Sequence, residues 1–183
     1  GGTLLYASYG TGFESDVAPN QPRYVNRGET LQALQSRQVE LGAKGALGNG
    51  EWTVAAFDID RPVSADVGSC DGDDSCTRVR DGSAVPRGVE ATLAGRYGPW
   101  DIGGGAMALR ARREDSANAA IDGLRPANVP AYTVELQVGY RVAALPGLQL
   151  LANGLYESNR IVLPDNSLSI PHVTRIDLGL RYE

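Results

Sequence analysis

The chain has 183 residues, of which 42% are hydrophobic and 21% charged, and this balance excludes a disordered chain. No apolar run approaches the roughly 20 residues that a membrane-spanning helix needs. The formal net charge is −5 and the basic residues are scattered, which argues against a nucleic-acid partner.

In chain order, residues 3–13 are the first strand candidate because they are rich in aromatic and apolar side chains. Residues 14–35 carry Pro, Asn and Gly and are expected to form a long loop, with a short turn of helix over residues 31–34. Residues 36–62 predict two strands joined by the connector Gly48-Asn49-Gly50, whose residues tolerate positive φ.

This hairpin shows the alternation of a sheet with one apolar and one polar face. On its first strand, Val39, Leu41 and Ala43 alternate with Gln38, Glu40 and Lys44. On its second strand, we expect Thr53, Ala55, Phe57 and Ile59 on the apolar face and Asp58 and Asp60 on the polar face.

The rest of the chain repeats the pattern. Further strands are expected over residues 85–97, 101–113, 131–142, 148–158 and 172–182. Long irregular stretches are expected over residues 62–85 and 114–130, a medium loop over 159–171, and short turns at 98–100 and 146–147. The apolar side chains of these strands are expected to share one face: Val89, Ala91, Leu93, Met107, Leu109, Ala111, Tyr132, Val134, Leu136, Val138, Tyr140, Leu150, Ala152, Tyr156, Thr174, Ile176, Leu178 and Leu180.

The expected fold class is therefore all-β, an antiparallel up-and-down meander of about eight strands. Strands of about ten residues match a tilted membrane-spanning strand. Short turns at one end and long loops at the other are typical of an outer-membrane barrel. The opposite face carries charges that a water-filled lumen accepts: Glu40, Lys44, Asp58, Asp60, Glu90, Arg96, Glu135, Arg141, Arg175 and Asp177. Five aromatic residues beside the short turns fit an interfacial girdle: Trp52, Tyr97, Trp100, Tyr140 and Tyr182.

Two cysteines, Cys70 and Cys76, flank a short Gly/Asp-rich segment. We expect a disulfide in an oxidising compartment, with two free thiols as the alternative. Zinc binding is disfavoured because the single histidine, His172, is distant.

Five phrases in succession resemble the barrel of TonB-dependent siderophore receptors. They are LLYASYGTGFE, SRQVELGAKGALGNGEWTVAAFDIDRP, PRGVEATLAGRYGPWDIGGGA, DGLRPANVPAYTVELQVGYRV and IPHVTRIDLGLRYE. The resemblance implies a 22-stranded outer-membrane barrel in a Gram-negative bacterium, plugged by an N-terminal domain, that imports ferric siderophores with energy from TonB. Plug, TonB box and closing strands have no counterpart in residues 1–183, so we expect an internal part of such a barrel, with the TonB complex contacting a preceding region.

The resemblance also implies the kinds of site to look for. The ferric siderophore is expected as cargo, with no resident cofactor, no metal site and no catalytic residue. Arg23, Tyr24, Arg125 and Tyr156 are the ligand-binding candidates, because aromatic and cationic groups suit an anionic ferric chelate. The acids Asp71, Asp73 and Asp74 fit a solvated loop better than a calcium site. No enzyme motif is present.

Two other classes remain open from the sequence. One is a structural or adhesive outer-membrane β-barrel domain. The other is a soluble antiparallel β-sandwich that binds a partner through its surface.

Overall fold

The computed structural model describes residues 2–183, most of which belong to one antiparallel sheet. The sheet has eight strands in the order β1-β2-β3-β4-β5-β6-β7-β10. Their bounds are β1 Thr3–Glu14, β2 Leu34–Leu47, β3 Gly50–Gly68, β4 Cys76–Tyr97, β5 Trp100–Glu114, β6 Tyr132–Arg141, β7 Leu148–Glu157 and β10 Val173–Tyr182. A small hairpin of β8 (Arg160–Ile161) and β9 (Ser169–Ile170) lies in the last long connection. The expected meander of about eight strands is confirmed.

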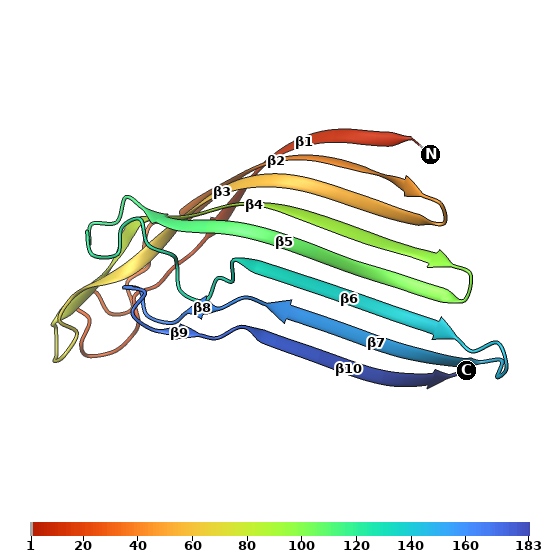
Figure 1. The fold of residues 1–183 in the computed structure, drawn as a ribbon. Coiled ribbons are helices and arrows are strands. Elements are labelled where there is room, and N and C mark those ends of the chain that lie inside the picture. The colour runs from red at the N-terminus through yellow and green to blue at the C-terminus, as the bar shows by residue number, and fades with distance from the viewer. Residues whose placement is uncertain (1) are drawn as a thin grey trace.

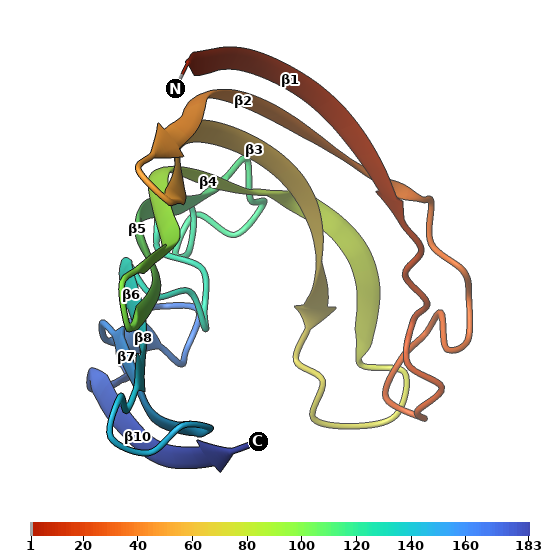
Figure 2. The same cartoon turned by 90° about the vertical axis from the view of Figure 1, so that its right-hand side faces the viewer.

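The sheet is a single curved layer. Its short turns gather at one end, hereafter the turn end, and its long connections at the other, the loop end (Figure 1). Seen from the side, the strands trace an open arc whose free edges are β1 and β10 (Figure 2). A soluble sandwich needs two packed sheets, so that alternative is wrong for this chain.

The turns follow from glycines that adopt left-handed backbone conformations. Gly48 has a φ of 60° and Gly98 a φ of 61°. Leu47 pairs directly with Gly50, so the first turn has two central residues, Gly48 and Asn49. Such two-residue turns fix the register of the flanking strands.

One face of the sheet, the apolar face, is continuous across all eight strands, because cross-strand partners point to the same side. It consists of Leu5, Ala7, Tyr9, Val39, Leu41, Ala43, Trp52, Val54, Ala56, Val89, Ala91, Leu93, Ile102, Ala106, Ala108, Val134, Leu136, Val138, Leu150, Ala152, Tyr156, Ile176, Leu178 and Leu180. Many of these side chains are exposed, with Leu178 at 81% and Leu5 at 78%. Nothing in residues 2–183 packs on this face, which is the arrangement of a surface made for lipid rather than water.

The other face, the polar face, carries most of the charges that the sequence placed there. They are Glu40, Lys44, Glu90, Arg96, Glu135, Arg141, Arg175 and Asp177. On β2 the polar-face positions Gln38 and Glu40 are half-buried while Val39 and Leu41 on the apolar face are exposed. This difference agrees with a polar face on the concave side of the arc.

On β3 and β5 the side chains project to the opposite sides of the sheet from those expected. Phe57 pairs with Glu40 and Ala55 with Glu90, so both lie on the polar face. Met107 likewise pairs with Glu90. The corrected set for the polar face comprises Thr53, Ala55, Phe57, Ile59, Met107, Leu109 and Ala111, whereas Asp58 and Asp60 project from the apolar side near the loop end.

The connection expected over residues 62–85 is also different. β3 and β4 continue as a paired hairpin as far as Gly68 and Cys76, past a register shift between Pro62 and Ser64. Only residues 69–75 form its tip. The short helix expected over residues 31–34 is wrong, because Leu34 already begins β2.

Candidate ligand-binding surface

Near the turn end, the polar face holds one carboxylate between two guanidinium groups. Arg96 Nε donates a hydrogen bond of 2.9 Å to Asp101, and Arg141 forms an ion pair of 2.5 Å with the other carboxylate oxygen. Gln149 Nε2 donates to that same oxygen at 3.2 Å. Two cations on one anion leave a net positive charge, which a wet lumen tolerates far better than a dry core.

A second polar group spans β1 and β2. The Tyr6 hydroxyl donates to Glu40 at 2.7 Å, and the Lys44 ammonium lies 5.8 Å from the centre of the Tyr6 ring. Gly42 gives this ring its place, because a Cβ there would lie only 2.4 Å from it. A glycine at position 42 therefore leaves the room that the Tyr6 ring occupies beside β2.

Between β6, β7 and β10 the polar face contains a hollow of about 470 Å³. Its polar lining consists of Glu135, Gln137, Asn153, Arg175 and Asp177. Arg175 donates to Asp177 at 2.9 Å. Carboxylate, guanidinium and amide groups at this density suit a hydrated or charged partner rather than an apolar one.

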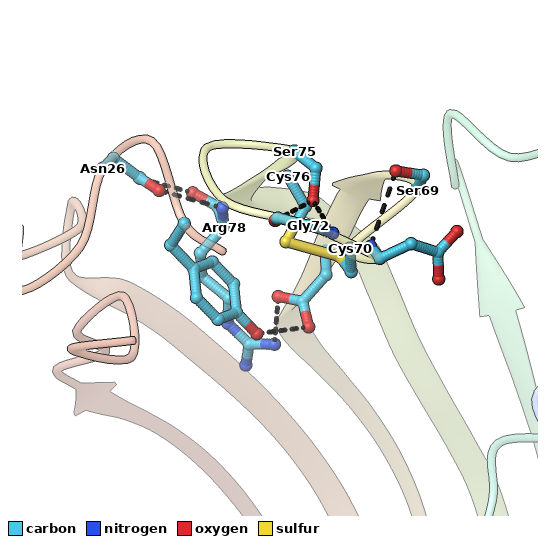
Figure 3. Close-up of a disulfide and its surroundings, with 10 residues drawn as sticks. Asn26, Ser69, Cys70, Gly72, Ser75, Cys76 and Arg78 are labelled. Carbon is cyan, nitrogen blue, oxygen red and sulfur yellow. Dashed lines mark hydrogen bonds and ion pairs between the residues drawn. A yellow bond between two sulfur atoms is a disulfide. The ribbon is translucent and has the colours of Figure 1, made fainter. Parts of the chain in front are cut away.

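At the loop end, the β1–β2 connection docks onto the β3–β4 hairpin (Figure 3). Tyr24 is 1% exposed, and its hydroxyl donates to Asp66 at 2.8 Å. Arg78 forms ion pairs with Asp66 at 3.2 Å and Asp16 at 3.3 Å. Asn26 completes the contact with two hydrogen bonds to the backbone of Arg78.

The tip of the same hairpin is closed by a disulfide between Cys70 and Cys76, whose Cα atoms are 4.8 Å apart (Figure 3). The carbonyl of Cys76 accepts a hydrogen bond of 2.9 Å from Val25 N–H. The disulfide thus closes the hairpin tip at Cys76, the residue to which the β1–β2 connection is hydrogen-bonded. Asp74, one of the three loop acids, pairs with Arg27 at 2.7 Å, and residues 2–183 contain no cluster of three potential metal ligands.

A buried carboxylate anchors the β5–β6 connection. Asp81 on β4 accepts hydrogen bonds from the Ser116 hydroxyl and Ala117 N–H, both at 2.7 Å, and pairs with Arg113 at 3.1 Å. Burial alone would raise the pKa of Asp81, but the hydrogen bonds from Ser116 and Ala117 and the nearby guanidinium hold this pKa below its ordinary value. Sequence patterning gave no sign of this anchor, because Asp81 lay in a segment expected to be irregular.

The structure does not bring the four predicted ligand residues together. Tyr24 is buried in the loop contact, and Arg23 lies exposed with its guanidinium 5.2 Å from the Tyr24 ring. Arg125 donates to the carbonyls of Val129 and Asn159 and so joins two loops. Tyr156 pairs with Val134 and therefore projects from the apolar face.

The sheet is antiparallel, with one exposed apolar face, one charged face, and short turns and long loops at opposite ends. These features together define a segment of a membrane β-barrel. The sequence profile of the family described as TonB dependent receptor-like, beta-barrel matches residues 2–183. The chain belongs to this family. Its members are receptors rather than enzymes, which confirms that the chain is not an enzyme.

Solved structures of receptors share the fold. BauA, the ferric preacinetobactin receptor from Acinetobacter baumannii, is 30% identical with a TM-score of 0.79, over 98% of this chain and 27% of that one. FyuA, the ferric yersiniabactin uptake receptor from Yersinia pestis, is 19% identical with a TM-score of 0.78, over 98% and 27%. The siderophore receptor PiuA from Acinetobacter baumannii is 20% identical with a TM-score of 0.76, over the same shares.

The likeness to FyuA and PiuA shows the fold alone, and the chain spans about a quarter of the length of these receptors. A comparison with the sequences of curated proteins gave no match. Within residues 2–183, no helix has the length and apolarity needed to cross a membrane.

Proposed function

We propose that the chain is part of the barrel of an outer-membrane receptor that binds a ferric siderophore and imports it in a TonB-dependent way. The observation that carries this proposal is the 30% identity over 98% of the chain with the ferric preacinetobactin receptor. The two-faced sheet supports it, since a barrel wall needs an apolar outside and a polar bore.

In this proposal the free edges of β1 and β10 pair with further strands of the same barrel. The unpaired N–H and C=O groups of an edge strand are costly in lipid, because no water is available to bond them. Closing the barrel would satisfy both edges and bring the polar face around a lumen.

The ferric siderophore would pass as cargo along this polar face, with no resident cofactor. The hollow lined by Glu135, Asn153 and Arg175 offers charged and amide groups along that route. The contact with TonB would be made by a region that precedes residue 1. The cell location proposed is the outer membrane of a Gram-negative bacterium.

The test is uptake of radiolabelled iron in a strain deleted for the full-length gene and grown without free iron. The probes are ferric preacinetobactin, a ferric catecholate and a ferric hydroxamate, each supplied separately. Uptake of at least one probe should fall to background in the deletion strain and in a strain lacking TonB, and return on complementation. Unchanged uptake of all three would count against the proposal.

A further inference from the structure

The long connections at the loop end form two groups, each held together by its own hydrogen bonds. The first group, hereafter the arm unit, consists of the β1–β2 connection, residues 15–33, and the outer parts of β3 and β4, residues 63–82. The side chains of Tyr24 and Asn26 bond from the first segment to the second. Because these contacts are spread over the length of the unit, we expect its two segments to move as one body.

The second group, hereafter the hairpin unit, consists of the β5–β6 connection, residues 115–131, and the β7–β10 connection, residues 158–172. Arg125 N–H donates to Asn166 Oδ1 at 3.2 Å, and Asn166 Nδ2 donates back to the Arg125 carbonyl at 2.9 Å. The Arg125 guanidinium also donates to the Asn159 carbonyl at 3.3 Å. These bonds join the two connections into a second body.

The two units are bonded to each other through a single side chain, that of Asp81 at the base of the arm unit. Its carboxylate accepts hydrogen bonds of 2.7 Å from the Ser116 hydroxyl and from Ala117 N–H of the hairpin unit. Within residues 2–183, no other hydrogen bond or ion pair runs between the units. The attachment of one unit to the other therefore depends on this carboxylate.

The contact at Asp81 is either complete or broken. Asp81 is buried, and a buried carboxylate that keeps only part of its donors is costly. The backbones are in close approach here, since a Cβ at Gly82 would lie 2.3 Å from the Glu114 carbonyl oxygen. The closed contact is not fully satisfied, however, because Arg113 Nε is buried beside it without an acceptor. This unmet donor lowers the stability of the closed state relative to the open one.

The base of the arm unit has the features of a hinge. The pairing of β3 with β4 changes register between Pro62 and Ser64, and Gly82 on the facing strand has a φ of 63°. Such a bulge bends a strand and interrupts its ladder, and hinges consist of a few residues that absorb a backbone change. Seen from the turn end, both units curve toward the concave side of the sheet (Figure 2).

We propose that the two units are the halves of a divided cap over the loop end of the polar face, and that Asp81 is the latch that joins them. With Asp81 bonded to Ser116 and Ala117, the loop end is one rigid cap. With these bonds broken, the arm unit turns about the hinge at Pro62 and Gly82, and a passage opens between the halves. The inference rests on these contacts and not on which cargo is carried.

The test uses the full-length gene product in phospholipid vesicles and measures distances between spin labels by double electron–electron resonance. Labels at Asn20→Cys in the arm unit and Ala119→Cys in the hairpin unit, both exposed positions, report the separation of the units. The wild type should show one predominant distance. Asp81→Asn should raise the population of a second, longer distance about tenfold, because an amide cannot accept all the hydrogen bonds of the carboxylate. Ser116→Ala should act in the same direction.

Two controls separate parting of the units from general loosening. Asp74→Asn removes the same charge from an exposed ion pair of the arm unit and should leave the distance between the units unchanged. Label pairs within one unit, Asn20 with Val67 and Ala119 with Leu163, occupy exposed positions. They should keep one narrow distance when the latch is broken.

An unchanged distance between the units in both Asp81→Asn and Ser116→Ala would overturn the proposal, because another contact would then hold the cap together. A wild type without a predominant distance, a longer distance in Asp74→Asn, or broadening within either unit would overturn it as well. If Asp81→Asn does not insert, Ser116→Ala decides, since an unchanged distance there contradicts the proposal. The distances are measured without cargo, so their outcome is independent of the proposed transport function.

Discussion

The Tyr24 hydroxyl donates a hydrogen bond of 2.8 Å to Asp66, across 42 residues of sequence. The contact joins the β1–β2 connection to the outer part of β3. Because Tyr24 is almost fully buried, the two segments form one packed unit at the loop end rather than two independent loops.

Removing this hydroxyl should loosen the unit. Tyr24→Phe is expected to cost about 0.5–1.5 kcal/mol of docking free energy through the lost hydrogen bond, and Tyr24→Ala about 3–5 kcal/mol through loss of the buried ring. Trypsin cleavage after Arg23 and Arg27 reports the opening. Tyr9→Phe is the control, because Tyr9 is 68% exposed on the apolar face. Equal cleavage of all three variants would contradict this account.

Breaking the disulfide should act on the same unit. The bridge closes a loop with a sequence separation of six, for which chain entropy predicts about 2 kcal/mol. In Cys70→Ser/Cys76→Ser, hydrogen exchange at Val25 N–H should accelerate, because Val25 donates to Cys76. Exchange in β6 and β7 should stay the same. A general rise in exchange across the sheet would show that the bridge supports the barrel wall instead.

The β5–β6 connection should detach in acid. The pKa of Asp81 is held below its ordinary value of 3.8 in the folded chain, so its stabilising contribution is present above that value and is lost as pH falls through the lower folded pKa. Asp81 lies eight residues beyond Val89, the last residue of β4 on the apolar face toward the loop end. Proteolysis of residues 115–124 should therefore be slow at pH 5 and fast well below pH 3.8. Asp81→Asn should remove this pH dependence, and a wild-type transition near neutral pH would refute the assignment.

The corrected orientation of β3 can be tested at adjacent positions. Val54 pairs with Ala91 on the apolar face, and Thr53 pairs with Thr92 on the polar face. Val54→Arg should lower the free energy of unfolding in lipid vesicles by about 2–4 kcal/mol, since charge on the lipid face of a barrel is costly. Thr53→Arg should change it little. The reverse order in urea titrations would restore the orientation expected from hydrophobicity.

The sequence was sufficient to predict the two faces of a strand where one of them is uniformly apolar. Strand β6 alternates Val134, Leu136 and Val138 with Glu135 and Gln137, and both faces were predicted correctly. Loop sorting by length likewise predicted the two ends of the sheet.

Hydrophobicity alone was insufficient to orient β3 and β5, because small residues such as Ala56 and Ala106 occupy part of their apolar face. Large apolar side chains, Phe57 and Met107, lie on the polar face instead. Only the cross-strand register, set by the two-residue turn after Leu47, fixes the orientation.

The loop end was the least predictable part. Pro62, Pro86 and Gly82 interrupt the pattern of β3 and β4, although pairing continues through this region. The partners of Tyr24 and Asp81 are distant in sequence and depend on how the loops fold back. Tyr156 was predicted as a ligand contact, and its pairing with Val134 places it on the apolar face.

The most direct test of which face meets lipid uses spin labels at two neighbouring positions of β6, Leu136→Cys and Gln137→Cys, in the full-length gene product in phospholipid vesicles. The label at 136 should collide more often with oxygen, which concentrates in lipid, than with a water-soluble nickel chelate, because Leu136 lies on the apolar face. The label at 137 should show the opposite preference. Equal accessibility at both positions, or the reverse pattern, would contradict a sheet whose apolar face contacts the bilayer and whose polar face lines water.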